Sequence, residues 1–345
     1  MRLFTRFLPI WILLAVLLLF GGYWLYWNRL ADGLAAGAEA WVGARRDQGQ
    51  KAAYDHIEIR GFPYRVTLEI DRPRIGGRAG DLAWRWQAEF LSAYFQPWNL
   101  NHAIFVTEGA QTVAWRRGDR RGQVRLTARD SRASLVTDPA GRVLRYALDI
   151  QNGGADIAGV GQAAFDRLQL TGRNNSGENQ ARPAGSFDVG ARADGVTLPP
   201  GWPMALGQAV KLVRFVARLD PPVPASPARQ DIARWRDDGG VVEVSGLEIT
   251  WGPLAVAAEG SVTLDPAMRP AGAFSTRLKG HDATLDALNR AGLLSSGAAL
   301  TAKAALGLLS KHDQDGEPYV PAPVTAQGGR LYLGPVPILP LAPIL

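Results

Sequence analysis

Residues Gly246–Val256 read G-L-E-I-T-W-G-P-L-A-V, and this stretch carries the pattern that decides the fold. Its apolar residues occupy every second position up to Trp251. Such alternation buries one face of an antiparallel sheet and leaves the other face polar. In the Gly252-Pro253 pair, glycine permits an unusual backbone angle, while proline restricts φ and withholds a hydrogen-bond donor. We therefore expect the pair to bend one strand into the next without losing the alternation.

The same pattern returns near the C-terminus. Residues Gly328–Ile338 read G-G-R-L-Y-L-G-P-V-P-I, with Gly334-Pro335 at the corresponding bend. Both stretches fit G-x-x-[IL]-x-[WL]-G-P-[LV]-x-[VI], which we interpret as a structural repeat.

A looser relative of the pattern spans residues 56–66, with Gly61, Phe62 and Pro63 at its bend. Chance is the alternative for this copy, because the chain contains 39 Gly and 23 Pro. If the copy is real, Phe62 turns inward and caps the apolar face on the side of the N-terminal segment.

Alternating apolar residues fill most of the chain after Tyr54, and Gly, Pro and Asp turn signals separate them. The sequence therefore predicts a mainly β fold with a few helices (α+β), built on a large, mostly antiparallel, elongated or curved sheet. The run P-P-G-W-P at Pro199–Pro203 is the expected division between a first β-rich half, residues 54–198, and a second, residues 199–345. The alternating sets include Ile57–Ile59, Tyr64–Ile70, Trp84–Phe90, Val124–Ala128, Tyr146–Ile150, Phe187–Ala191, Val213–Leu219 and Phe274–Leu278.

Three short helices are expected in the second half. The first covers residues 227–238, with Ser226 as its N-cap and Gly239 at its end. The second covers residues 283–291 after Asp282 as cap, and the third covers residues 296–311.

The N-terminal segment Phe7–Trp27 carries no charge over 21 residues. A helix that crosses a bilayer needs about 20 apolar residues. The segment is therefore predicted to be a transmembrane helix, preceded by a cytoplasmic tail (residues 1–6) and continued by a juxtamembrane helix (residues 28–53). Arg2 and Arg6 place the N-terminus in the cytoplasm by the positive-inside rule, so the body is exported.

Two alternatives remain for this segment. Small residues at Ala36–Ala38 and Ala38–Ala40 are candidate cleavage sites of a signal peptide, although the apolar run is longer than such peptides usually have. The other alternative is a buried core helix.

Motifs that carry catalysis or cofactor binding are absent from the sequence. The chain has no cysteine, and its four histidines lack the spacing of metal ligands. No P-loop, dinucleotide fingerprint or G-x-S-x-G motif occurs. The net charge is +6, but we interpret the arginines as dispersed along the chain, which disfavours nucleic-acid binding. We expect no enzyme activity, no cofactor and no metal.

Three segments in this order resemble a family of uncharacterised single-pass bacterial envelope proteins. They are G-F-P-Y-R at Gly61–Arg65 after the hydrophobic anchor, A-R-W-R-D-D-G-G-V-V-E-V at Ala233–Val244, and G-G-R-L-Y-L-G-P-V-P-I near the end. The strand-rich body is also distantly similar to AsmA-like envelope proteins. The resemblance implies an inner-membrane anchor, a periplasmic body and a role in envelope homeostasis or in moving lipid along a β groove. It supplies no catalytic residue.

Tryptophans are the candidate lining of such a groove, above all Trp84, Trp86 and Trp251. The alternative is that they form ordinary sheet core. The favoured hypothesis is a membrane-anchored protein that shields or conveys lipid or other hydrophobic envelope material. The alternative hypothesis is an envelope scaffold or assembly factor that binds another protein, with the proline-rich C-terminal tail as the candidate binding segment.

Overall fold

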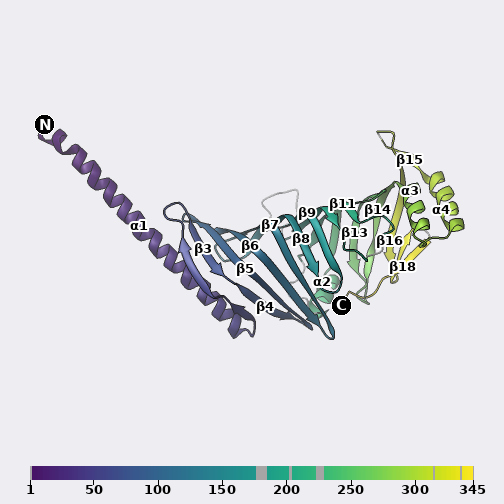
Figure 1. The fold of residues 1–345 in the computed structure, drawn as a ribbon, viewed down its shortest axis with the longest axis horizontal. Helices are drawn as coiled ribbons and strands as arrows, with labels where there is room; N and C mark the ends of the chain where they lie inside the picture. The colour runs from purple at the N-terminus through teal and green to yellow at the C-terminus, as the bar shows by residue number, and fades with distance from the viewer. Residues whose placement is uncertain are drawn as a thin grey trace.

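The computed structural model describes residues 2–175, 185–201, 204–222, 229–313, 315–334 and 336–344. The molecule is elongated, with a long helix at one end and a helix pair at the other (Figure 1). The helices are α1 Arg2–Asp47, α2 Arg229–Asp237, α3 His281–Arg290 and α4 Ser296–Leu309. The strands are β1 Lys51–Ala53, β2 His56–Arg60, β3 Val66–Asp71, β4 Arg74–Ala79, β5 Leu82–Gln96, β6 Asn99–Arg117, β7 Arg120–Thr137, β8 Val143–Ile157, β9 Gly161–Asn174, β10 Phe187–Thr197, β11 Ala209–Asp220, β12 Val241–Trp251, β13 Leu254–Leu264, β14 Pro270–Lys279, β15 Lys311–His312, β16 Pro318–Gln327, β17 Arg330–Leu333 and β18 Val336–Pro340.

Helix α1 joins the expected transmembrane and juxtamembrane helices into one continuous helix. Its apolar part has a mean hydropathy of 1.9 and is long enough to cross a membrane, and only 6% of that window is buried. Such low burial is incompatible with a core helix. The helix ends before residue 53, because Gly49 adopts φ +73° and its N–H reaches back to the carbonyl of Arg46. The last residues of the range expected to be helical form β1 instead.

The strands form an antiparallel meander. β5 is long enough to pair with both β4 and β3 along one edge, and each later strand up to β14 pairs with the next one in the chain. The sheet then continues through β16, β17 and β18. β10 and β11 pair from Phe187–Leu219 to Thr197–Ala209, so the sheet runs without a break past Pro199–Pro203, of which residues 202–203 lie outside the described part.

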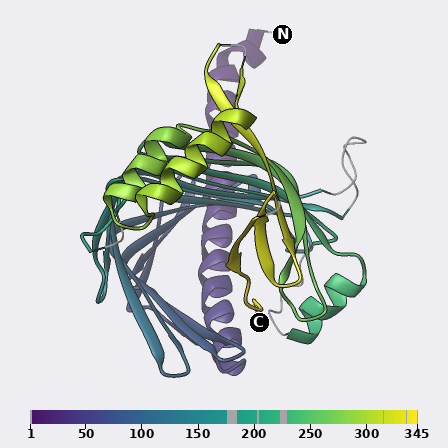
Figure 2. The same cartoon turned by 90° about the vertical axis from the view of Figure 1, so that its right-hand side faces the viewer.

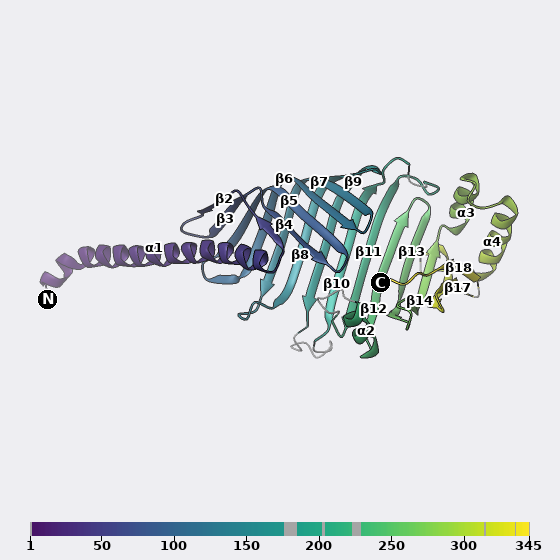
Figure 3. The same cartoon turned by 90° about the horizontal axis from the view of Figure 1, so that it is seen from below.

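The sheet curves into a trough. Figure 2, viewed along the molecule, shows the strands wrapping around a hollow, and α1 crosses the hollow side. Figure 3 looks into the open side from below. The predicted mainly β fold with a large antiparallel, curved sheet and an N-terminal apolar helix is confirmed.

A line of backbone irregularities crosses the long strands. Gly109 in β6, Asn152 in β8 and Gly195 in β10 have φ of +75°, +49° and +61° within otherwise extended chain. The β5–β6 register shifts beside Gly109, between Ala88 and Phe90. Irregularities of this kind change which side of the sheet the following residues face. The positive φ favours glycine at Gly109, and a Cβ there would lie 2.1 Å from Oε2 of Glu89 and displace that carboxylate.

At both Gly-Pro positions the chain reverses direction between one strand and the next. Trp251 pairs directly with Leu254 across Gly252-Pro253, where Gly252 has φ +55°. A two-residue hairpin favours glycine at its first position, and proline is excluded from the ladder because it has no N–H. The second copy also reverses the chain, since β17 and β18 pair across Gly334, which has φ +57°. Its Pro335 lies outside the described residues.

The short helices lie at the far half of the trough. α2 begins at Arg229, and the expected start at residues 227–228 with its Ser226 cap falls outside the described residues. α3 begins earlier than expected, with Gly280 at the N-cap position in place of Asp282. α4 begins after Ser295, whose side chain accepts a hydrogen bond from the Ala298 N–H, and ends at Leu309.

Candidate functional site

The hollow side of the sheet is apolar across its whole width, and we call it the trough face. Residues that pair directly from strand to strand form one row without a charged side chain. In order from β3 to β17, this row is Val66, Phe95, Ala103, Leu135, Tyr146, Gly172, Val189, Ala217, Val244, Gly260, Phe274, Val324 and Leu333. Since residues on one row share a side of the sheet, the alternating sets of many separate strands make a single surface.

The trough face continues on the other side of the line of irregularities. Trp86 Nε1 donates to Gln111 Oε1 at 3.2 Å, and Gln111 Nε2 donates to Ser131 Oγ at 3.0 Å. Ser131 pairs with Ile150, which lies on the trough face. Trp86 therefore faces the trough as well, although simple alternation would put it on the other side. The expected set Trp84–Phe90 is wrong at its end, because Phe90 pairs with Asp71 and Glu108.

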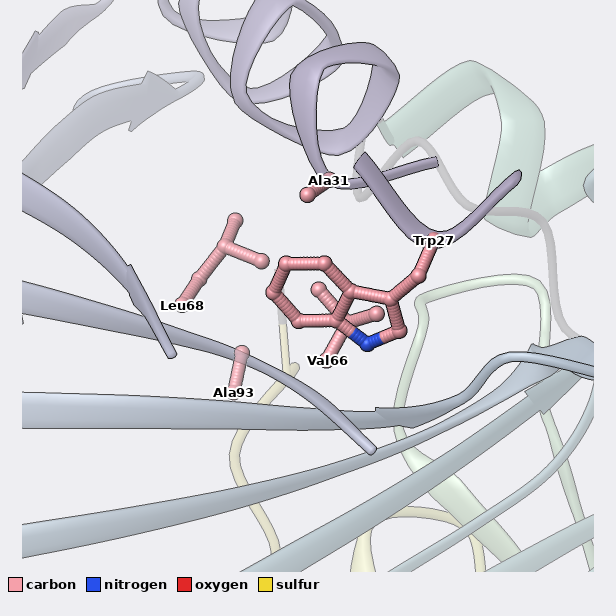
Figure 4. Packing of buried hydrophobic residues seen from close by; sticks show 5 residues of the cluster. All are labelled: Trp27, Ala31, Val66, Leu68 and Ala93. Carbon is pink, nitrogen blue, oxygen red and sulfur yellow. The ribbon is translucent and has the colours of Figure 1, made fainter. Parts of the chain in front are cut away.

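Helix α1 covers the first strands of the trough face. Trp27 and Ala31 pack against Val66, Leu68 and Ala93 of β3 and β5, and all five are buried (Figure 4). Residues of α1 one and two turns further on, such as Leu34 and Ala38, continue this contact. The sheet thus begins with its apolar side covered by α1.

The loop Gly61–Arg65 joins β2 to β3 and clamps the same helix. The Phe62 ring packs edge-on against Trp27, with ring centroids 5.6 Å apart, and also contacts Phe20 and Tyr23. Trp27 Nε1 donates to the Arg65 carbonyl at 3.1 Å, and the Tyr23 hydroxyl donates to the Pro63 carbonyl. Phe62 therefore contacts the helix, and it stays 37% exposed.

We call the contacts between the loop Gly61–Arg65 and α1 the clamp, and Gly61 determines the shape of this loop. Its φ is +105°, and a Cβ there would lie 2.7 Å from the Arg65 carbonyl oxygen. A residue with a side chain would therefore push the loop away from the helix.

A second loop meets α1 at the same level. The Tyr26 hydroxyl donates to the carbonyl of Pro97, in the turn between β5 and β6, at 2.6 Å. Tyr64 and Trp98 lie in the two loops and are exposed. Together with the tyrosines of α1 they form a band of aromatic side chains, which is the composition of a membrane–water interface.

Beyond the first strands the trough face has little cover. Helix α1 contacts β1, β2 and β3, while α3 contacts β13 and α4 contacts β16. Among the described residues, no helix packs extensively over β7–β12. The side chain of Leu170 in β9 is 37% exposed, whereas Val66 beneath the helix is 0% exposed. Most of the trough face is a single layer that presents apolar side chains to a hollow.

The tryptophans predicted to line a groove are not gathered at one place. Trp84 lies over Gly77 near the free ends of β4 and β5 and is partly exposed. Trp86 is half-buried and tied to Gln111. Trp251 stands far along the sheet in β12, where its Nε1 donates to the Gly207 carbonyl at 2.7 Å. All three lie on strands of the trough, but aliphatic and small residues make up most of its surface.

The convex side of the sheet is held by ion pairs. Arg167 contacts Asp149 at 2.7 Å across β8 and β9, and Arg214 contacts Glu248 at 2.7 Å across β11 and β12. The hydrogen bond from Arg167 lowers the pKa of Asp149 below its ordinary value. The charged rows alternate with the apolar row, so the two sides of one sheet differ sharply in polarity.

One feature of the convex side was missed from the sequence. Arg116 and Arg121 pair directly with each other in the β6–β7 hairpin, beside Arg85 of β5. The signal was present as W-R-R-G-D-R-R-G at residues 115–122, a basic hairpin that the overall dispersion of arginine concealed.

Of the described residues, no group of three or more His, Cys, Asp or Glu side chains could hold a metal ion.

Comparison with known proteins gives a family but no function. No curated protein and no solved structure matches the chain. The family described as "Uncharacterized protein conserved in bacteria" (DUF2125) matches residues 27–342. Because that match covers most of the sequence, from Trp27 of the clamp to the strands at the far end of the trough, the chain belongs to the DUF2125 family.

Proposed function

We propose that the protein is a non-enzymatic, single-pass inner-membrane protein whose periplasmic trough shields or conveys lipid or other hydrophobic envelope material. The observation that carries this proposal is the uncharged row that crosses the sheet from β3 to β17, with cover from α1 only at its beginning. Large exposed apolar surfaces mark interaction sites, because water makes them costly to leave open. A trough has the shape that acyl chains can fill lengthwise.

The packing of α1 supports its retention as an anchor. Cleavage near Ala38 or Ala40 would remove Trp27 and Ala31 from the hydrophobic cluster on β3 and β5. It would also strip Phe62 of its three aromatic partners on the helix. A removable signal peptide has no need of such contacts, so we assign α1 to a permanent anchor.

The clamp sets the position of the trough relative to the bilayer. Tyr23 and Tyr26 sit at the end of the apolar run, where interfacial aromatics belong, and each donates to a loop of the sheet. These loops therefore rest at the bilayer surface, and the covered end of the trough begins there. Arg2 and Arg6 place the body on the periplasmic side.

The proposal is tested by photo-crosslinking in intact cells. A benzoylphenylalanine in place of Leu170 or Phe215 faces the trough, whereas one in place of Thr171 or Arg214 faces the convex side. We expect lipid adducts, identified by mass spectrometry, at the first pair and few at the matched pair one residue away. Equal yields on both sides would contradict a lipid-bearing trough.

A scaffold is the second candidate, and a specific surface favours it. Leu293, Leu300, Leu308 and Leu309 are exposed on and beside the α3–α4 pair at the far end of the molecule. The C-terminal tail contributes less, because β18 pairs with β17 and the Ile344 N–H donates to the Met268 carbonyl. Protein adducts at Leu300 together with no lipid adducts at Leu170 would favour this function over the first.

A further inference from the structure

We propose that the convex side carries a binding site for phosphate groups, formed by Lys51, Arg78, Arg85, Arg116 and Arg121. We call it the basic pocket. These side chains line a hollow of about 950 Å³ at the free ends of β4–β7, beside the end of α1. The site lies on the opposite side of the sheet from the trough face, so it does not depend on the proposed lipid function.

The strand register brings the five cations together. Lys51, Gly76, Arg85 and Ala114 form one row of directly paired residues across β1, β4, β5 and β6. The next row on the same side contains Arg78, Ala83, Arg116 and Arg121. Small residues stand between the cations in both rows, which leaves space above the sheet for a ligand.

The row between these two, Gly77, Trp84, Trp115 and Gly122, belongs to the other side of the sheet, and so does the row on the other flank of the first one. Ala52, Ile75, Trp86 and Val113 pair across the same strands. Trp86 faces the trough, so the cations face away from it.

No carboxylate belongs to the lining of the basic pocket. Within the described part of the chain, none of the five cations has an ion-pair partner within 4.0 Å. The neighbouring Arg117 differs, because it contacts Asp81 at 2.9 Å and does not line the pocket. Two other hollows on the convex side are lined by side chains of both positive and negative charge. One has Arg145, Arg218, Asp188 and Glu243 in its lining, and the other has Lys279, Asp313 and Glu248.

Without a bound anion, repulsion between these cations lowers the stability of the folded chain. Arg116 stands directly opposite Arg121, and Arg117 directly opposite Arg120. Like charges opposite one another on a sheet destabilise it. Elsewhere on the convex side the same fold places a carboxylate across from an arginine, as in Arg214–Glu248.

Phosphate is the anion whose chemistry fits these residues. Arginine offers several N–H donors in a planar fork and binds phosphate oxygens in pairs. Cations spread over neighbouring strands about 5 Å apart can contact more than one phosphate oxygen, or two phosphate groups of one ligand. The source is a free phosphate compound or the phosphate of a lipid headgroup.

The test uses the full chain in nanodiscs of phosphatidylcholine, with binding measured by isothermal titration calorimetry. Inorganic pyrophosphate represents the free source, and dihexanoyl phosphatidic acid represents the headgroup, with zwitterionic dihexanoyl phosphatidylcholine, whose phosphate is a diester and whose net charge is zero, as its counterpart. The pocket variant is Arg85→Gln with Arg116→Gln. The matched control is Arg117→Gln with Arg214→Gln, which removes the same charge outside the pocket.

We expect the wild-type chain to bind at least one of the two phosphate probes. The pocket variant should bind it at least about tenfold more weakly, because each lost charge-assisted hydrogen bond is worth that much. The control should change affinity less than about twofold. Binding of pyrophosphate assigns the site to free phosphates, and binding of phosphatidic acid alone assigns it to headgroups.

The proposal is overturned if neither probe binds, or if the pocket variant binds as well as wild type. Misfolding is separated from loss of the site by the melting temperature without ligand. It should not fall in the pocket variant, because Arg116→Gln removes a like-charge pair.

Discussion

The covered end and the middle of the trough face have the same alternating sequence pattern but differ in burial. Beneath α1, Val66 and Leu68 are 0% and 4% exposed and belong to a packed cluster. In the middle of the sheet, Leu170 occupies an equivalent alternating position and is 37% exposed. The difference teaches that alternation sets the polarity of each side of a sheet, while the cover over the apolar side has to come from elsewhere in the chain or from a ligand.

The largest expected effect is at the covered end. Trp27→Ala removes a buried ring, its contact with Phe62 and its hydrogen bond to the Arg65 carbonyl. We expect the free energy of unfolding to fall by about 3–5 kcal/mol, measured by denaturant titration in detergent micelles. The matched control is Trp24→Ala on the same helix, whose side chain is exposed. Equal losses in the two variants would show that α1 is not packed on the sheet as described.

A second pair compares a leucine at the covered end with one in the middle of the sheet. Leu68→Ala should cost about 2–4 kcal/mol, because it leaves a cavity under the helix. Leu170→Ala should cost about 1 kcal/mol, since its side chain already meets the hollow. The same titration measures both. If Leu170→Ala were as costly as Leu68→Ala, the middle of the trough would be covered too.

Glycines in the turns at the two ends should also differ. Gly61→Ala meets both an unfavourable φ and a 2.7 Å approach to the Arg65 carbonyl, so we expect a loss of about 2 kcal/mol. Gly334→Ala has a φ of +57° with nothing within 4 Å, and should cost about 1 kcal/mol. Melting temperatures of the two variants give the comparison, and the reverse order would contradict the clamp geometry.

The smallest effect concerns the convex side that both regions share. The hydrogen bond from Arg167 lowers the pKa of Asp149 below its ordinary 3.8 in the folded chain. The folded state then binds this proton less readily than the unfolded state, so the stabilisation is present above about pH 3.8 and is lost as the pH falls through the folded pKa. Melting curves between pH 6 and pH 2 should show a shallower acid decline for Asp149→Asn.

Thr171→Val, which removes no titratable group from the same side, should retain the wild-type acid decline. A wild-type slope in Asp149→Asn would mean that the Asp149–Arg167 pair contributes nothing measurable.

Much of this architecture could be predicted from sequence. The uncharged run Phe7–Trp27 predicts a helix of membrane length. Alternation in stretches such as Phe187–Ala191 and Val213–Leu219 predicts antiparallel strands. Both signals are local, because a helix needs only its own apolar length and a strand needs only a period of two. The Gly-Pro pairs were also visible, but their role as reversals depended on the partner strand, which the pattern does not name.

The candidate sites were decided by tertiary structure. Which strands pair, and in which register, decides three contacts. Trp27 packs against the sheet, Trp86 faces the trough, and Arg85 lies beside Arg116. Such contacts join residues far apart in the chain, and a shift of one position would move every side chain to the opposite side. The sequence by itself determined that one side of each strand is apolar. Only the folded sheet decided that these sides form one trough. Its curvature is the sum of many strand pairings, and its cover comes from α1, which packs on the first strands.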